Sequence, residues 1–216
     1  VTTGPPGRRC ARAFLSWAAA RKLVPRVTVP ARPHQLPSST ITASHLQAFV
    51  HRLATDSSIA AVERTAGLLV ALYGQPATRL VRLRVDHVTI NGNQVTLRLG
   101  RHHVELPPVL AGLVVELVTD RPLRGLSAPA VSPWLFPGGH PGRPLTANWL
   151  AARITTHGLP VAELRAAALL ELAAELPAAF LADLLGISAG TAVRWSHAAG
   201  GEWARYAATR ARTSTR

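Results

Sequence analysis

The chain has 216 residues and a formal net charge of +13, and hydrophobic residues make up 48% of it. This apolar fraction excludes a wholly disordered chain. The single cysteine, Cys10, excludes an intrachain disulfide and a cysteine-based zinc site. A surface this positive indicates a polyanionic partner, for which nucleic acid is the default candidate. Lys22 is the only lysine, so almost all of the positive charge is arginine, and the methionine-free, arginine-rich composition of a GC-rich genome can account for part of it.

The apolar stretches are too short or too interrupted to cross a membrane. The first residues, VTTGPPGRRCARAF, hold no long apolar core and do not resemble a signal peptide. The longest apolar stretch, near Ala166–Leu185, is interrupted by Glu171, Glu175, Pro177 and Asp183. We therefore expect a soluble, cytoplasmic protein that associates with the nucleoid and not with a membrane.

A proline-rich linker divides the chain. Ala11–Leu23 has the apolar spacing of a helix, and Val24–Ser39 carries four prolines. We place a domain boundary within this linker. The expected organisation is an N-terminal helix and linker over residues 1–39, the main domain over 40–209 and a basic tail over 210–216.

The main domain begins with helices and then changes to strands. Ser44 is expected to cap a helix through Ala54, and Ser57 or Ser58 a second helix through Tyr73. The elements expected next are a helix from Ala77 to Val85, strands over 88–90, 95–99 and 104–106 with a turn at Asn91-Gly92, and a helix over Pro108–Asp120.

After a Pro/Gly/Ser-rich loop over Arg121–Pro133, the helical spacing returns. Helices are expected over Thr146–Thr155, Pro160–Glu175, Ala178–Gly186 and Ala189–Ala199. The predicted fold class is α+β and mainly α-helical, with one small three-stranded antiparallel sheet.

Six segments of the main domain carry a family resemblance: LLVALYGQPATRLVRLRVDHV, QVTLRLGRHHVELP, SPWLFPG, GRPLT, AELRAAALLELA and LADLLGIS. Together they resemble the catalytic domain of tyrosine recombinases, the phage integrase family, in a degenerate form found in GC-rich bacteria. The resemblance runs from about Thr40 to Ala208, and it makes Ala11–Leu23 a remnant of the preceding core-binding domain. It implies the recombinase fold and double-stranded DNA as partner. It also implies a recombinase-like protein or a second copy of the chain as a further partner, and no cofactor.

Active members of the family use a tyrosine nucleophile, two arginines that hold the phosphate, and histidine and lysine residues that move protons. Most of these positions hold other residues in this chain. The first arginine falls at Pro76, and the box written His-x-x-Arg reads Ala162-Glu163-Leu164-Arg165, which retains only the arginine. Arg79 lies one turn after Pro76 and could partly replace the missing arginine.

The remaining positions are also substituted. The hairpin lysine has no counterpart, although Arg101 can supply charge there, the next imidazole falls at Ile187, and the nucleophile falls at or beside Trp195. Tyr206, eleven residues later, is the one displaced nucleophile that the resemblance leaves open. Because the catalytic groups act as a unit, the resemblance implies a domain without strand-transfer activity.

Residues 180–199 also fit a helix-turn-helix. Gly186 makes the turn, Ser188 caps the second helix, and Leu181, Leu184, Leu185, Ile187, Ala192 and Trp195 face the core. Thr191, Arg194 and His197 then point outward, where a recognition helix would read a major groove.

Each of these candidate residues also has a purely structural interpretation. Arg165 can pair with Glu163 or Glu171 instead of phosphate, and Arg79, Arg82 and Arg84 can form a solvated helix face. Trp134, Phe136 and Trp195 are expected in the core. His102 and His103 are adjacent on a strand and point to opposite faces, so no shared metal is expected.

The sequence thus predicts a catalytically inactive DNA-binding protein derived from a site-specific recombinase. The residues expected at DNA are Arg79, Arg82, Arg101, Arg165, Thr191 and Arg194. Two alternatives remain open: an active recombinase that uses Tyr206, and a protein-interaction module whose charge is compositional.

Overall fold

The computed structural model describes residues 14–15, 17–25, 41–120, 132–140 and 142–200. The chain divides into two units, Val1–Gln35 and Leu36–Arg216. In the first unit, residues 14, 15 and 17–20 are helical, so the helix ends before Leu23. The predicted domain boundary at residue 39, the loop over 121–131, the tail over 210–216 and Tyr206 lie outside the described residues.

The second unit begins with two helices, α2 (Ala43–Thr55) and α3 (Ala61–Tyr73). The residue that caps α2 is Thr42, whose hydroxyl accepts the N–H of His45, so the prediction of Ser44 was wrong. No side chain caps α3, because its N-cap position is Ala60, and Ser58 lies earlier, where its N–H and hydroxyl donate to the carboxylate of Asp56. Capping by Ser57 or Ser58 was therefore also wrong.

The helix expected from Ala77 to Val85 is shorter in the structure. It ends as α4 (Ala77–Leu80), and a 3₁₀ turn follows over Val85–His87. Between them the backbone pairs with a distant segment, since Leu135 N–H donates to the Leu83 carbonyl and Val85 N–H to the Pro133 carbonyl. These tertiary hydrogen bonds replace the local ones that would continue the helix.

The three strands form one antiparallel sheet in the order β1-β2-β3, as predicted. They are β1 (Val88–Asn91), β2 (Gln94–Arg98) and β3 (His103–Glu105). Asn91 pairs with Gln94, so the turn is Gly92-Asn93, one residue later than expected, with Gly92 at a φ of 59°. Positive φ values are the reason that glycine suits this position.

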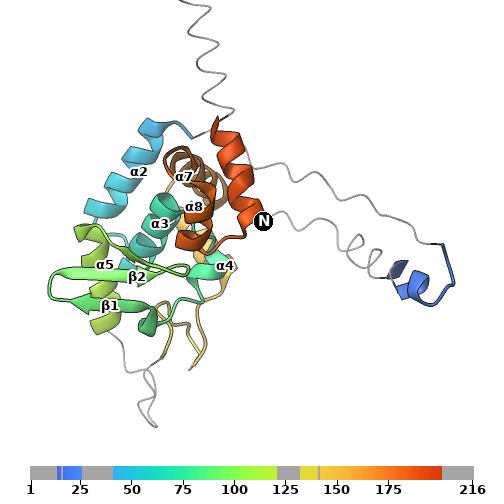
Figure 1. The fold of residues 1–216 in the computed structure, drawn as a ribbon. Coiled ribbons are helices and arrows are strands. Elements are labelled where there is room, and N and C mark those ends of the chain that lie inside the picture. Colours follow the sequence, from blue (N-terminus) through green and yellow to red (C-terminus); the bar gives the residue numbers. More distant parts are fainter. Residues whose placement is uncertain (1–13, 16, 26–40, 121–131, 141, 201–216) are drawn as a thin grey trace, which may run out of the picture. The chain divides into compact units, whose positions relative to one another are not determined.

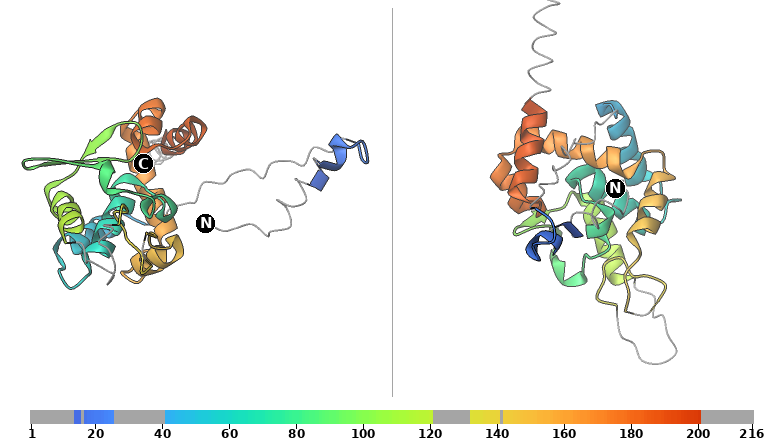
Figure 2. Two further views of the ribbon diagram at one scale, coloured as in Figure 1. Left: turned by 90° about the horizontal axis from the view of Figure 1, so that it is seen from below. Right: turned by 90° about the vertical axis from the view of Figure 1, so that its right-hand side faces the viewer.

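The later helices lie close to their predicted bounds. They are α5 (Pro108–Thr119), α6 (Ala147–Thr155), α7 (Val161–Glu175), α8 (Ala178–Leu185) and a helical segment over 189–200. In Figure 1, α3 lies inside the unit, where it packs against α2, α4, α5, α6 and α7. In both views of Figure 2, the C-terminal helices lie together, in orange to red. In the described part of the chain, no helix is both long and apolar enough to cross a membrane.

Two hydrophobic clusters form the core. The larger lies among α2, α3, α5, α6 and the sheet, and the smaller joins α7, α8 and residues 189–200. Helix α7 contributes to both, with Leu164 in the first and Leu169 in the second. Phe136 and Trp195 are buried as predicted. Trp134 is only half-buried, which is less than predicted. Its indole N–H donates to the Gly142 carbonyl, and the Arg84 guanidinium lies 5.8 Å from its ring.

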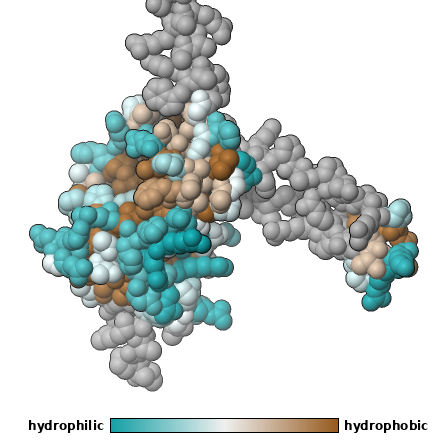
Figure 3. Space-filling model, in the orientation of Figure 1, coloured by the Kyte–Doolittle hydropathy of each residue, from teal (hydrophilic) through white to brown (hydrophobic). Residues whose placement is uncertain are grey.

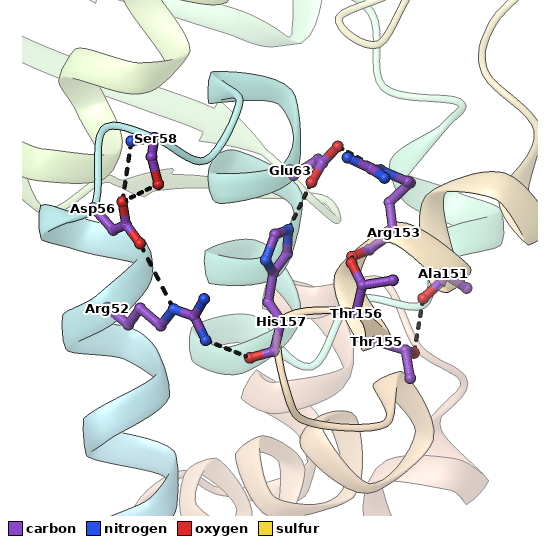
Figure 4. A network of polar contacts seen from close by, with 9 residues as sticks. All are labelled: Arg52, Asp56, Ser58, Glu63, Ala151, Arg153, Thr155, Thr156 and His157. Atoms are coloured by element: carbon purple, nitrogen blue, oxygen red, sulfur yellow. Dashed lines mark hydrogen bonds and ion pairs between the residues drawn. The ribbon is translucent and has the colours of Figure 1, made fainter.

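A buried polar group connects α3 with α6 (Figure 4). Glu63 is only 4% exposed, and its two carboxylate oxygens contact Arg153 Nε at 2.7 Å and His157 Nε2 at 2.6 Å. Burial acts to raise the pKa of Glu63, but hydrogen bonds from His157 and Arg153 outweigh it, so the pKa lies below its usual 4.5. Arg52 of α2 joins the network through the His157 carbonyl.

Candidate nucleic-acid interface

Arg79 holds the end of α8 against the sheet. Its guanidinium donates to the carbonyls of Leu185 at 2.7 Å, Gly186 at 2.8 Å and Leu99 at 3.3 Å. The last carbonyls of a helix lack partners within the helix and carry partial negative charge, which a cation compensates. Arg79 is therefore not part of a freely solvated helix face, and hydrogen bonds to three carbonyls fix its position.

The turn between β2 and β3 packs on the same helix end. Arg101 N–H donates to the Asp183 carbonyl at 2.8 Å, and Arg101 Nη1 lies 3.5 Å from a carboxylate oxygen of Asp183. A Cβ on Gly100 would clash with the Asp183 carbonyl oxygen and lie 2.6 Å from Gly186 N. Only glycine allows the hairpin to approach α8 so closely. Arg79 and Arg101 thus meet at one end of α8.

Arg165 lies beside Arg79. Its Nε donates to the Gly74 carbonyl at 2.8 Å, which ties α7 to the end of α3. The pKa of Arg165 is lowered, first by burial and then by the positive charge of Arg79. The retained arginine of the family box is thus near a second cation, and its hydrogen bond goes to backbone rather than to Glu163 or Glu171.

Arg79 also lines a pocket of about 450 Å³. It is lined by Gln75, Arg79, Arg82, Leu83, His87, Arg98, Leu99 and Gly100. Arg98 and His87 are absent from the sequence-predicted DNA set. The alternation of β2 offered a signal for Arg98, because it stands exposed between the buried Leu97 and Leu99. In Figure 3 the face that carries the hairpin and α4 is mainly hydrophilic, and the surface over α7 and α8 is more apolar.

Thr191 and Arg194 lie on the helical segment after α8. Thr191 N–H donates to the hydroxyl of Ser188, which caps the segment, and Arg194 Nη2 donates to the Thr191 hydroxyl at 3.1 Å. Ala192 and Trp195 are buried on the opposite side, and Gly186 makes the preceding turn at a φ of 65°. Arg194 and His197 are exposed, whereas Thr191 is half-buried.

The position that holds the nucleophile in the family is buried in this chain and almost inaccessible to solvent. Trp195 is 1% exposed within the smaller hydrophobic cluster, and its indole N–H has no hydrogen-bond partner among the described residues. The other tyrosine of the chain, Tyr73, is also unsuited to attack, because burial raises its pKa to about 12. Nowhere in residues 41–120, 132–140 and 142–200 do three His, Cys, Asp or Glu side chains gather as a metal site.

Comparison with known proteins identifies the fold. No protein-family model matches the chain, and no curated protein matches its sequence. Among solved structures, the XerH site-specific recombinase bound to difH substrate before cleavage is 17% identical, with a TM-score of 0.59 over 87% of this chain and 59% of that one. The XerH post-cleavage complex with palindromic difH is 18% identical, with a TM-score of 0.57 over 80% and 53%.

The XerA recombinase is a third such structure, 16% identical, with a TM-score of 0.55 over 86% of this chain and 68% of that one. This chain spans between 53% and 59% of the length of the two XerH chains. The shared features are the mainly helical body and the small antiparallel sheet in the predicted place. The chain therefore has the fold of the tyrosine recombinase catalytic domain.

Proposed function

We propose that this protein binds duplex DNA on a recombinase-derived fold and does not cut it. The observation that carries this proposal is the pocket lined by Arg79, Arg82 and Arg98 with no carboxylate side chain in its lining, while Arg165 lies near Arg79 outside that pocket. A fold shared with DNA-bound XerH supports DNA as the polyanion. Phosphate contacts of this kind bind without regard to sequence and weaken as salt rises.

The residues at the catalytic positions argue against strand transfer. Trp195 cannot attack phosphorus, Pro76 has no side-chain donor for phosphate, and the guanidinium of Arg101 is a poor substitute for a lysine that donates a proton. Trp195 is also packed among Leu169, Leu181 and neighbouring apolar side chains, so no water or substrate group reaches it. When several catalytic groups that act together are lost, a single surviving arginine cannot restore strand transfer.

Sequence choice would come from the helical segment over 189–200. Ser188 and Gly186 set its start, and the exposed Arg194 stands one turn after Thr191. In a helix-turn-helix such residues reach base edges in the major groove, and arginine pairs with guanine through two hydrogen bonds. Arg101 and Arg165 would contribute phosphate contacts, and the whole interface would associate the protein with the nucleoid.

The deciding experiment is a salt titration of binding to random duplex DNA, with nicked duplexes run on denaturing gels beside it. We expect salt-sensitive binding and no covalent protein–DNA adduct, either for the wild type or for Trp195→Tyr, which restores only the hydroxyl. An adduct that Tyr206→Phe abolishes would instead establish an active recombinase. No binding even at low salt would favour a protein-interaction module.

A further inference from the structure

The pocket beside Arg79 is lined mainly by residues outside the positions that carry the family chemistry. It lies between α4, the 3₁₀ turn at His87 and the end of β2. Of the positions that the resemblance connects with catalysis, only Arg79, which could partly replace the first arginine, lines it; Pro76, Arg101, Ala162, Arg165, Ile187 and Trp195 do not. Apart from Arg79, whatever the pocket binds is thus held by a different set of side chains.

Three guanidinium groups converge on this pocket without a carboxylate. Arg79 is fixed by the carbonyls of Leu185, Gly186 and Leu99, so its charge cannot turn away. Arg82 and Arg98 are exposed, and neither forms an ion pair with any described residue. Like charges held this close repel each other, and an anion between them relieves that repulsion.

His87 also lines the pocket, and the nearby positive charges affect its pKa. Its pKa is lowered, first by burial and then by the positive charge of Arg98, with Arg84 and His103 acting in the same direction and Asp86 opposing them. The Arg84 N–H donates to Nδ1 of His87 at 3.4 Å, so a neutral ring carries its proton on Nε2. A neutral ring can donate one hydrogen bond from Nε2, which lies 3.8 Å from a carboxylate oxygen of Asp86.

We propose that Arg79, Arg82, Arg98 and His87 form a binding site for a phosphate oxyanion. Exposed guanidinium forks bind phosphate with two parallel hydrogen bonds, and here the exposed forks of Arg82 and Arg98 line the same pocket as the fixed charge of Arg79. The occupant is a backbone phosphodiester of duplex DNA, a choice that rests on the proposed function. A free phosphate or the phosphate of a nucleotide offers the same chemistry and is separated by the experiment.

The test uses the full chain with inorganic phosphate and random duplex DNA as probes. The imidazole resonance of His87, assigned by its loss in His87→Gln, is followed by NMR as each probe is added. We expect a saturable shift with phosphate and a rise in the pKa of His87, because the bound anion offsets the charge of Arg98. Both probes are then titrated against a variant carrying Arg82→Gln and Arg98→Gln.

The matched control carries Lys22→Gln and Arg143→Gln, which remove the same charge from exposed sites outside the pocket. Both pairs are surface changes, so each variant is expected to unfold within about 0.5 kcal/mol of the wild type. Phosphate affinity should fall by on the order of tenfold or more in the pocket variant and by less than about twofold in the control.

The outcomes separate the two proposals. If the pocket variant loses phosphate affinity and its log–log salt slope with DNA falls by about two units, the site and its occupant are both supported. If it loses phosphate affinity while DNA binding is unchanged or absent in every variant, the site takes free phosphate and the DNA assignment fails. If phosphate leaves His87 unmoved, or the control loses as much affinity as the pocket variant, the site is overturned even where DNA still binds.

Discussion

Glu63 lies in the core with Arg153 on one carboxylate oxygen and His157 on the other. Its pKa is depressed in the folded state, so it stabilises the fold at any pH above about 4.5, its unfolded value. That contribution is lost as the pH falls through the folded pKa, because the protonated acid no longer holds the Arg153 cation.

Glu63→Gln should therefore destabilise the protein by about 1–3 kcal/mol at pH 7, since it leaves the hydrogen bonds of a buried group weakened. The deficit should shrink as the pH drops below about 4.5 and the wild-type carboxylate also becomes neutral. Urea unfolding at each pH measures it. Glu171→Gln, at an exposed position of α7, is the control and should cost less than about 0.5 kcal/mol. A deficit that stays constant from neutral to acid pH would contradict this account.

At the scale of elements, the close approach of the β2–β3 turn to α8 depends on glycine at position 100, whose side chain is a single hydrogen atom. Gly100 stands where a Cβ would meet backbone atoms of Asp183, Leu184 and Gly186. Backbone cannot rotate aside as a side chain can, so the turn itself would have to move. The contact between the hairpin and α8 therefore does not tolerate a side chain at position 100 unless the turn is displaced.

Gly100→Ala should cost about 1–3 kcal/mol of stability. Gly112→Ala, the same change in α5 where a Cβ meets nothing within 4 Å, should stabilise by about 0.5–1 kcal/mol. Thermal or urea unfolding of both variants measures the contrast. Equal effects for the two variants would show that the turn does not pack on α8.

The segment over 189–200 makes a separate prediction. If Arg194 reads a base, Arg194→Ala should weaken binding to a selected target duplex by about 1–3 kcal/mol at one base pair and leave random duplex binding almost unchanged. Arg143→Ala removes an exposed arginine from another segment and should not alter sequence choice. Selection from a random library followed by competition binding measures both. Unchanged preference in Arg194→Ala would remove this segment from base recognition.

For the molecule as a whole, the net charge of +13 matters through the number of phosphates it neutralises. Arg165→Ala should lower the log–log salt slope by about one unit and weaken binding to all duplexes equally. Because Arg165 also donates to Gly74, the alanine variant should lose some stability as well. Arg165→Lys keeps the charge and should keep the slope, so a slope lowered equally in both variants would show that charge is not the cause.

Most of the fold could be predicted because the helical and alternating periods of the sequence are easily told apart. The sheet from β1 to β3 and the helices from α5 to α8 followed from those periods and their glycine and proline boundaries. The end of α4 could not be predicted, because Leu83 and Val85 bond to a segment about fifty residues later. The Glu63 network joins residues at least ninety positions apart, a separation that no local pattern reports.

The candidate site, too, could be predicted only in part from the sequence. Arg79 and Arg82 could be selected from motif context, but the backbone carbonyls that fix Arg79 belong to a helix end more than one hundred residues away. Arg98 and His87 carry no family motif, and they join Arg82 only through the packing of the hairpin beside α4. Arg101 was selected for its charge, but no feature of the sequence indicated that its guanidinium would lie 3.5 Å from a carboxylate oxygen of Asp183.

Helix α7 belongs to both hydrophobic clusters, and this has a consequence for how the protein opens. The smaller cluster depends on α7 for one wall, whereas the larger one also has α2, α3, α5 and the sheet. We therefore expect α8 and residues 189–200 to open more often than the whole unit unfolds, because this opening exposes less apolar area. The C-terminal helices should then behave as a separate cooperative unit, whose amides exchange with solvent before those of α3 and whose protection increases when a ligand bridges them to α4.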